Sequence, residues 1–274
     1  MDARTMEHYR ALTQDYGKRI LESIDQSSEP PHFLLDANEA CPHLNEYGLC
    51  NIILHCGEDH LCDICREHPR FYNDTPLGKE VGLGMACEEA CRLILTSDGY
   101  ADICKVGELD GEAEPFEFDP LSARPDIYSI LSDDTIPYLQ RLEAIMMRYG
   151  INLFAFSDAQ WRERLASLEF LDGVHREMFM NYTSHPVKNE AFEKPLERIL
   201  AYFVYRHCTS AWDMDEFVAA LGFSLVCERL IASIAAAQNA TLLPDLIEIA
   251  RIVSEEIEYS EENTDAIKEI FFVK

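Results

Sequence analysis

The chain has 274 residues, of which 47% are hydrophobic, and it carries 50 acidic residues against 23 lysines and arginines. This length suits one large or two small domains with a real core, and the hydrophobic fraction argues against wholesale disorder. The formal net charge of -27 works against a nucleic-acid backbone or an anionic membrane surface as partner. We therefore expect no nucleic-acid or membrane partner. The charge favours a basic, lysine-rich protein partner, or is simply a soluble surface.

The N-terminal residues are neither basic nor apolar, so they do not resemble a signal peptide. Apolar runs such as residues 230–237 are short, and none reaches the roughly 18 uninterrupted residues of a membrane-spanning helix. We therefore expect a cytoplasmic protein, in a compartment where cysteines bind metal or react more often than they form disulfides. The ten cysteines then need an explanation.

The first half of the chain contains most of the cysteines and is interrupted by turn-forming residues. A helix is predicted over residues 4–24, and a shorter one begins at Cys87. The acidic run at residues 108–115 is typical of a solvated linker, and Asp119-Pro120 and Arg124-Pro125 follow it. We therefore expect a boundary near residue 124, between a cysteine-rich metal- or cluster-binding region (residues 1–124) and a second domain (residues 125–274).

Helical spacing of apolar residues dominates the second domain. It predicts helices over residues 127–146, over 157–170 with Ser157 as N-cap, over 194–207, 215–238, 243–258 and 264–272. The segment 215–238 is apolar on most faces, so we expect it at the centre of a bundle. Alternating strand patterns are scarce. The predicted fold class is mainly α, a cysteine-rich loop and helix region followed by an all-α helical bundle.

The cysteines are concentrated in the first half, and their density favours a metal ion or a cluster. Cys62-x-x-Cys65 can direct two sulfur atoms to one metal, and Cys87 begins a helix, where a thiolate is favoured. The intervals are too irregular for a zinc ribbon but suit a four-thiolate site with zinc or an iron–sulfur cluster. The first-half cysteines are Cys41, Cys50, Cys56, Cys62, Cys65, Cys87, Cys91 and Cys104.

Burial as small apolar side chains is the alternative explanation for some cysteines. We expect it for Cys208, Cys227 and Cys104, and for one or two of Cys56, Cys62 and Cys91. A thioredoxin-type role for Cys62 and Cys65 is disfavoured because no strand–helix unit surrounds them. His207 interrupts an apolar helix and belongs either to a buried network or to a functional face. Histidines within the cysteine region could also be ligands, although exposed loop histidines are common; these are His43, His55, His60 and His68.

Several familiar catalytic motifs are missing from the sequence. There is no glycine-rich dinucleotide fingerprint after a strand, no phosphate-binding loop and no nucleophile elbow. A methyltransferase or dehydrogenase of the Rossmann type is therefore disfavoured.

Taken together, several segments resemble the flagellin lysine N-methylase family. The resemblance lies in Cys41-Pro-His-Leu, in Gly48-Leu-Cys50-Asn-Ile, in Leu61-Cys62-Asp-Ile-Cys65-Arg with Pro69-Arg70 after it, and in Met85-Ala-Cys87-Glu-Glu-Ala-Cys-Arg92. Downstream, Tyr202-Phe-Val-Tyr-Arg206-His207 and residues 254–263 are similar to the C-terminal half of that family. The resemblance covers most of the chain.

This resemblance implies a cytoplasmic enzyme that transfers methyl groups from S-adenosylmethionine to lysine side chains of flagellin. It also implies a cysteine-bound iron–sulfur cluster of the four-iron four-sulfur type, with zinc as the alternative. The cysteines that match those recurring in the family are Cys41, Cys50, Cys65 and Cys87, and these are the expected metal ligands. Members of the family begin with a further cysteine-rich stretch that is absent here, so we expect an impaired activity.

Lysine methylation requires a neutral amine aligned with the sulfonium methyl group, so a methyltransferase site must remove the ammonium proton. Tyr202, Glu258 and Tyr259 are candidates for this step, but the sequence identifies neither the catalytic residues nor the S-adenosylmethionine pocket. The alternatives to an enzyme are a non-enzymatic zinc- or iron-binding interaction module, and a helical interaction protein without metal.

Overall fold

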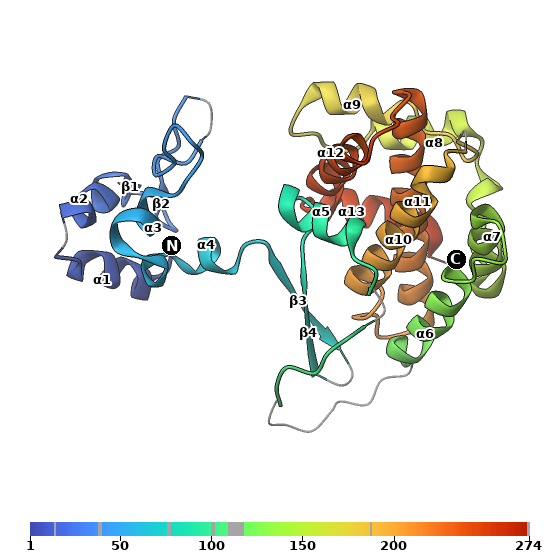
Figure 1. The fold of residues 1–274 in the computed structure, drawn as a ribbon, viewed down its shortest axis with the longest axis horizontal. Helices are drawn as coiled ribbons and strands as arrows, with labels where there is room; N and C mark the ends of the chain where they lie inside the picture. The colour runs from blue at the N-terminus through green and yellow to red at the C-terminus, as the bar shows by residue number, and fades with distance from the viewer. Residues whose placement is uncertain are drawn as a thin grey trace. The chain divides into compact units, whose positions relative to one another are not determined.

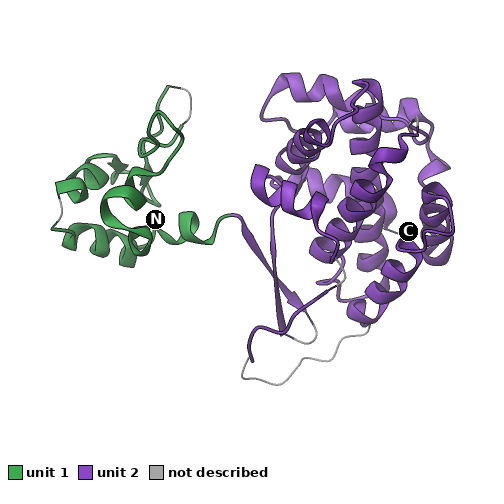
Figure 2. Ribbon diagram, in the orientation of Figure 1, with its two compact units in different colours: residues 1–68 green, residues 69–274 purple. Residues whose placement is uncertain are grey.

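The computed structural model describes residues 1–13, 15–37, 40–75, 78–99, 102–108, 118–186 and 188–272. The fold is mainly α, with 60% of the chain in helices and 7% in strands, as the sequence predicted. The described residues form two compact units, unit 1 (residues 1–68) and unit 2 (residues 69–274) (Figure 2).

Unit 1 is a small assembly of short helices and one minimal hairpin. It has a separate small core of six buried apolar residues; these are Met6, Tyr9, Ile20, Ile24, Ile52 and Cys62. Its elements are α1 (Ala3–Ala11), α2 (Asp15–Glu22), β1 (Ile24–Asp25), β2 (His32–Phe33), α3 (Asn51–Cys56), the 3-10 turn η1 (Glu58–His60) and α4 (Asp63–Glu67).

The single helix predicted over residues 4–24 is two helices, so that prediction is wrong. Helix α1 ends before Leu12, whose backbone is extended, and α2 begins at Asp15. Gly17 accounts for the close return of the chain, because a Cβ there would lie 2.7 Å from the Cβ of Leu12. Only a residue without a side chain permits this approach.

Unit 2 is a bundle of helices with one hairpin (Figure 1). Its first elements are β3 (Arg70–Thr75), β4 (Gly78–Leu83), α5 (Glu88–Thr96), α6 (Pro120–Leu131), α7 (Tyr138–Tyr149), η2 (Leu153–Ala155), α8 (Asp158–Ala166) and α9 (Gly173–Phe179). The remaining ones are η3 (Glu190–Phe192), α10 (Glu193–His207), α11 (Met214–Ala237), α12 (Leu243–Val253), the π-helical turn η4 (Ser254–Glu258), α13 (Glu261–Lys268) and η5 (Glu269–Phe271).

The division of the chain lies at residue 68 and therefore differs from the boundary expected near residue 124. Helix α5 packs against α10 and α12, and Met85, Cys91 and Leu95 are fully buried in the core of unit 2. This buried face places the segment after residue 68 with the bundle. The acidic run that we predicted as a linker falls largely outside the described residues, at 109–117.

Helix α11 is the central helix of unit 2, as its apolar faces predicted. Nearly all of its residues from Phe217 to Ala235 are buried, and it packs against α10 and α12. Among the described residues, it is the one helix long and apolar enough to cross a membrane, but 94% of the relevant segment is buried inside the protein. The same properties are expected of a core helix.

Two features of unit 2 bear on the other predictions. Ser157 caps α8 with a complete capping box that includes Gln160, which confirms the predicted helix start. The antiparallel hairpin β3–β4, in which Arg70 pairs with Leu83, was not predicted. Its strands alternate only between exposed and half-buried residues, so they lack the apolar alternation by which a strand is recognised.

Candidate functional site

The loop from Cys41 to Cys50 in unit 1 folds back on itself. The backbone N–H of Gly48 donates to the Asn45 carbonyl (2.9 Å), and the Asn45 N–H donates to that of Leu49 (3.0 Å). An isolated bridge then pairs Leu44 with Cys50. This turn brings Cys50 back beside Leu44, whose backbone N–H donates to the Cys41 carbonyl (3.1 Å). Cys41 and Cys50, with eight residues between them, therefore lie at the two ends of one closed loop.

Cys62 and Cys65 form the second half of the cysteine cluster. Cys62 is buried and precedes α4, whereas Cys65 lies within that helix. The thiol and the backbone N–H of Cys65 donate to the Cys62 sulfur, which, against the effect of burial, lowers the pKa of Cys62 to about 6. The pKa of Cys65 is raised, first by this hydrogen bond, then by burial, and also by the proximity of Cys62, Cys41 and Cys50. Cys62, Cys41 and Cys50 therefore all lie close enough to Cys65 to act on its pKa.

The buried hydroxyl of Tyr9 lies beside this cluster. It makes no hydrogen bond of good geometry within the described part of the chain, and the polar atom that it approaches is the sulfur of Cys62. Burial is the main reason why the pKa of Tyr9 is raised, with Cys62 and Cys65 adding to the effect.

The expected ligands Cys41, Cys50 and Cys65 thus belong to unit 1, whereas Cys87 belongs to unit 2. Cys87 is the N-cap of α5, without a side-chain capping bond. Cys62 is not among the four expected ligands, but it lies next to Cys65. The Cys62-x-x-Cys65 spacing is the sequence signal for this proximity. Across the described residues, no three His, Cys, Asp or Glu side chains stand ready-arranged around a metal position.

The other cysteines differ in burial, and the histidines of the cysteine region contact aromatic, hydroxyl or backbone groups. Cys208 and Cys227 are buried in the core, as predicted, and Cys91 is buried as well. The prediction that Cys104 is a core residue is wrong, because it is exposed. His43 is buried with both ring nitrogens occupied, by Tyr16 at 3.1 Å and by Ser23 at 2.8 Å. The other histidines of this region make the following contacts: His55 stacks on Tyr16, His60 stacks on His8, and the backbone N–H of His68 caps α4.

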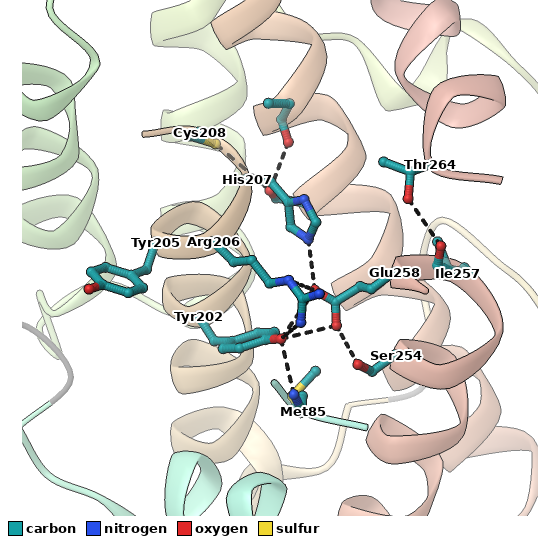
Figure 3. A network of polar contacts seen from close by, with 12 residues as sticks. Met85, Tyr202, Tyr205, Arg206, His207, Cys208, Ser254, Ile257, Glu258 and Thr264 are labelled. Atoms are coloured by element: carbon teal, nitrogen blue, oxygen red, sulfur yellow. Dashed lines mark hydrogen bonds and ion pairs between the residues drawn. The ribbon is translucent and has the colours of Figure 1, made fainter. Parts of the chain in front are cut away.

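A second cluster of chemical groups lies in unit 2, around the fully buried carboxylate of Glu258 (Figure 3). It accepts hydrogen bonds from the Tyr202 hydroxyl (3.2 Å), from His207 Nε2 (2.7 Å) and from the Ser254 hydroxyl. Arg206 Nε lies 3.3 Å away as its ionic partner. The π-helical geometry of η4 places Ser254 and Glu258 on the same side of the chain, and such turns are frequent at functional sites. His207 therefore belongs to a buried network.

Arg206 connects this network to the hairpin. Its Nη1 donates to the Tyr202 hydroxyl (2.7 Å), which also accepts the backbone N–H of Met85 (3.0 Å). Its guanidinium lies 4.8 Å from the ring centre of Phe71 and 5.1 Å from that of Tyr259, so aromatic rings stabilise the charge. Tyr202 and Glu258 are thus committed to internal partners, whereas 53% of Tyr259 is exposed.

The titration of this network predicts acid destabilisation of unit 2. Burial lowers the pKa of His207 from 6.5, although Glu258 opposes this effect. Burial acts to raise the pKa of Glu258, but Arg206, His207 and Ser254 outweigh it and keep the pKa below 4.5. Both groups bind protons more readily in the unfolded chain, so the stability that they contribute is complete above about pH 6.5 and is lost as the pH falls.

We therefore expect the free energy of unfolding of unit 2 to decrease between pH 7 and pH 4. Both tryptophans of the chain, Trp161 and Trp212, lie in unit 2, so their fluorescence during urea unfolding reports this unit. A His207→Gln variant keeps a donor toward Glu258 and should show a flatter slope between pH 7 and pH 5. Lys268 and Arg206 also act on His207, and both are unchanged in the variant. Equal slopes in the two proteins would show that His207 is not responsible.

Comparison with protein-family models, with curated proteins and with solved structures found no match to this chain.

Proposed function

We propose that unit 1 holds a metal ion or an iron–sulfur cluster through the thiolates of Cys41, Cys50, Cys62 and Cys65. The observation that carries this proposal is that Cys41, Cys50 and Cys62, from one folded loop and one helix start, all lie close enough to Cys65 to raise its pKa. Four thiolates are a complete ligand set for zinc and for iron–sulfur clusters. In small metal-binding domains, metal binding and the ordering of the ligands are coupled.

The small size of the core of unit 1 supports the same proposal. Its 68 residues contribute a described core of six buried apolar residues, and one of these is Cys62. Units of this size rarely obtain enough stability from apolar burial alone, and a metal site is one of the usual supplements. Metal binding would then stabilise unit 1 in addition to any chemistry that it supports.

We further propose that the metal-loaded chain is a protein-lysine N-methyltransferase that uses S-adenosylmethionine and acts on flagellin. The support is the resemblance of the cysteine segments and of residues 202–207 and 254–263 to the flagellin lysine N-methylase family. The net charge of -27 agrees with a lysine-rich partner, because it favours encounter with positive charge. If the chain binds metal without transferring methyl groups, the non-enzymatic zinc- or iron-binding module is the better description.

Metal analysis after anaerobic purification tests the ligand set. We expect about one zinc ion, or iron with acid-labile sulfide, in the wild-type chain and in Cys104→Ser, whose cysteine is exposed. Cys62→Ser should lose most of the metal, because it removes a ligand. Loss in Cys87→Ser with retention in Cys62→Ser would favour the set expected from the sequence. Protein without metal or sulfide would refute the proposal.

Methyl transfer is tested separately with the same preparations. Labelled S-adenosylmethionine and purified flagellin should give methyl-lysine with wild-type protein and with Cys104→Ser, but much less with Cys62→Ser. Metal content without any transfer would leave the metal site intact and would reject the enzyme. Transfer to lysine by metal-free protein would reject the role of the metal in the reaction.

A further inference from the structure

A cavity of about 340 Å³ lies within unit 2, and none of the described residues that line it belongs to the Glu258 network. Its size is at the lower end of the range of small-molecule sites, roughly 300–1,000 Å³. Its lining includes three small side chains of α11 and three larger apolar side chains from α7, η3 and α10. The small side chains are Ala232, Ala235 and Ala236, and the larger ones are Leu139, Phe192 and Leu196.

Hydrogen bonds fix the rim of this cavity. Asn189 caps η3 through its Oδ1 atom and donates from Nδ2 to the Ala240 carbonyl (3.3 Å). The Ala240 N–H in turn donates to the Ala235 carbonyl (2.9 Å) at the end of α11. Asn239 between them has a left-handed backbone (φ 53°), which is common for asparagine after a helix. The two segments at the rim are therefore tied together.

Arg229 lines the same cavity and is 4% exposed. Its Nε and Nη2 atoms donate to the carboxylate of Glu228, both at 2.5 Å, and the Tyr138 hydroxyl donates to the same carboxylate at 2.9 Å. Nη1 donates no hydrogen bond to any residue that the structure describes. Nη1 is not among the fully buried polar atoms that lack a partner, so it is open to solvent, and a ligand oxygen that replaces water is the expected partner.

The charges around the cavity indicate that the ligand is uncharged. Glu228 neutralises Arg229, and Lys188 at the rim is paired with Glu193 (3.0 Å) and lies 3.6 Å from Glu190. An anion would find no unpaired positive charge, because Glu228 balances Arg229 and Glu193 balances Lys188. A cation would find only the N–H donors of Nη1 inside the cavity. Because both charges are disfavoured, the remaining acceptor is a neutral oxygen.

We propose that this cavity binds a small, mainly apolar, uncharged molecule that presents a carbonyl or hydroxyl oxygen to Nη1 of Arg229. The site is independent of the metal and of methyl transfer. Three probes of equal chain length separate the possible head groups: hexyl methyl ketone, octanoate and octylamine. Titration calorimetry on the full chain should show the tightest binding for the ketone.

Filling the cavity provides the matched test. Ala236→Leu adds three carbon atoms inside the cavity and should weaken ketone binding at least about tenfold. Ala144→Leu makes the same change on the exposed side of α7 and should leave binding unchanged. Ala240→Leu serves as a second filling variant if Ala236→Leu does not fold, as judged by circular dichroism.

Three results would overturn the proposal. They are the absence of ketone binding at millimolar concentration, equal binding to the filled and wild-type proteins, and tighter binding of octanoate or octylamine than of the ketone. Arg229→Lys retains a cation beside Glu228 but loses the guanidinium edge, so it should also weaken ketone binding. Unchanged affinity in that variant would show that Arg229 is not the recognition group.

Discussion

Replacing Glu258 with alanine should lower the free energy of unfolding of unit 2 by about 3–5 kcal/mol. The reason is that Arg206, whose side chain is 12% exposed, would lose its counter-ion, and His207 Nε2 would lose its hydrogen-bond acceptor. The Tyr202 and Ser254 hydroxyls would lose their acceptor as well. Urea unfolding followed by tryptophan fluorescence measures the effect.

The neighbouring Glu255→Ala variant is the control for this prediction. Glu255 belongs to the same π-helical turn, but it is 39% exposed and pairs with Arg251 at 2.9 Å. Exposed pairs of this kind contribute only about 0–1 kcal/mol. Glu258→Gln adds a second comparison, because it keeps hydrogen-bonding capacity and removes only the charge. Equal, small effects of Glu255→Ala and Glu258→Ala would contradict the buried network.

Most helices of unit 2 were predictable because their apolar residues recur with helical spacing. The single helix predicted over residues 127–146 is wrong, since α6 ends at Leu131 and α7 begins at Tyr138, and α9 was not predicted. Ser157 was likewise recognisable as a cap, since the capping interaction is local in sequence. The break between α1 and α2 was missed because it depends on the packing of Gly17 against Leu12. Apolar spacing continues across such a break, and periodicity therefore does not reveal it.

The candidate sites were predictable to a smaller degree. The density of cysteines favours a metal site, and the choice of Cys87 as a ligand came from resemblance. The proximity of Cys41 and Cys50 to Cys65 depends on how the loop folds back, which the sequence does not show. The cavity could not be predicted, because it is space left between α7, α10 and α11. Its one signal in the sequence was Glu228-Arg229, a charged pair within the otherwise apolar segment 215–238.

The same pair is the subject of the second large prediction. Arg229→Met should lower the free energy of unfolding of unit 2 by about 3–5 kcal/mol, because it leaves the fully buried Glu228 without a counter-ion. Replacing both residues with leucine, in a Tyr138→Phe background that removes the hydroxyl otherwise left without an acceptor, should cost much less. Apolar residues often replace a buried ion pair without loss of stability.

Urea unfolding of four proteins measures the coupling between the two charges. They are the Tyr138→Phe background, Glu228→Leu and Arg229→Leu in that background, and the double leucine variant. Two single variants whose losses simply add in the double variant would show that the charges do not depend on each other. If the double variant is as stable as its background but no longer binds hexyl methyl ketone, the ion pair is not required for folding. The role of the ion pair in this apolar helix is then to hold Arg229 in position for the ligand, with Nη1 available as a donor.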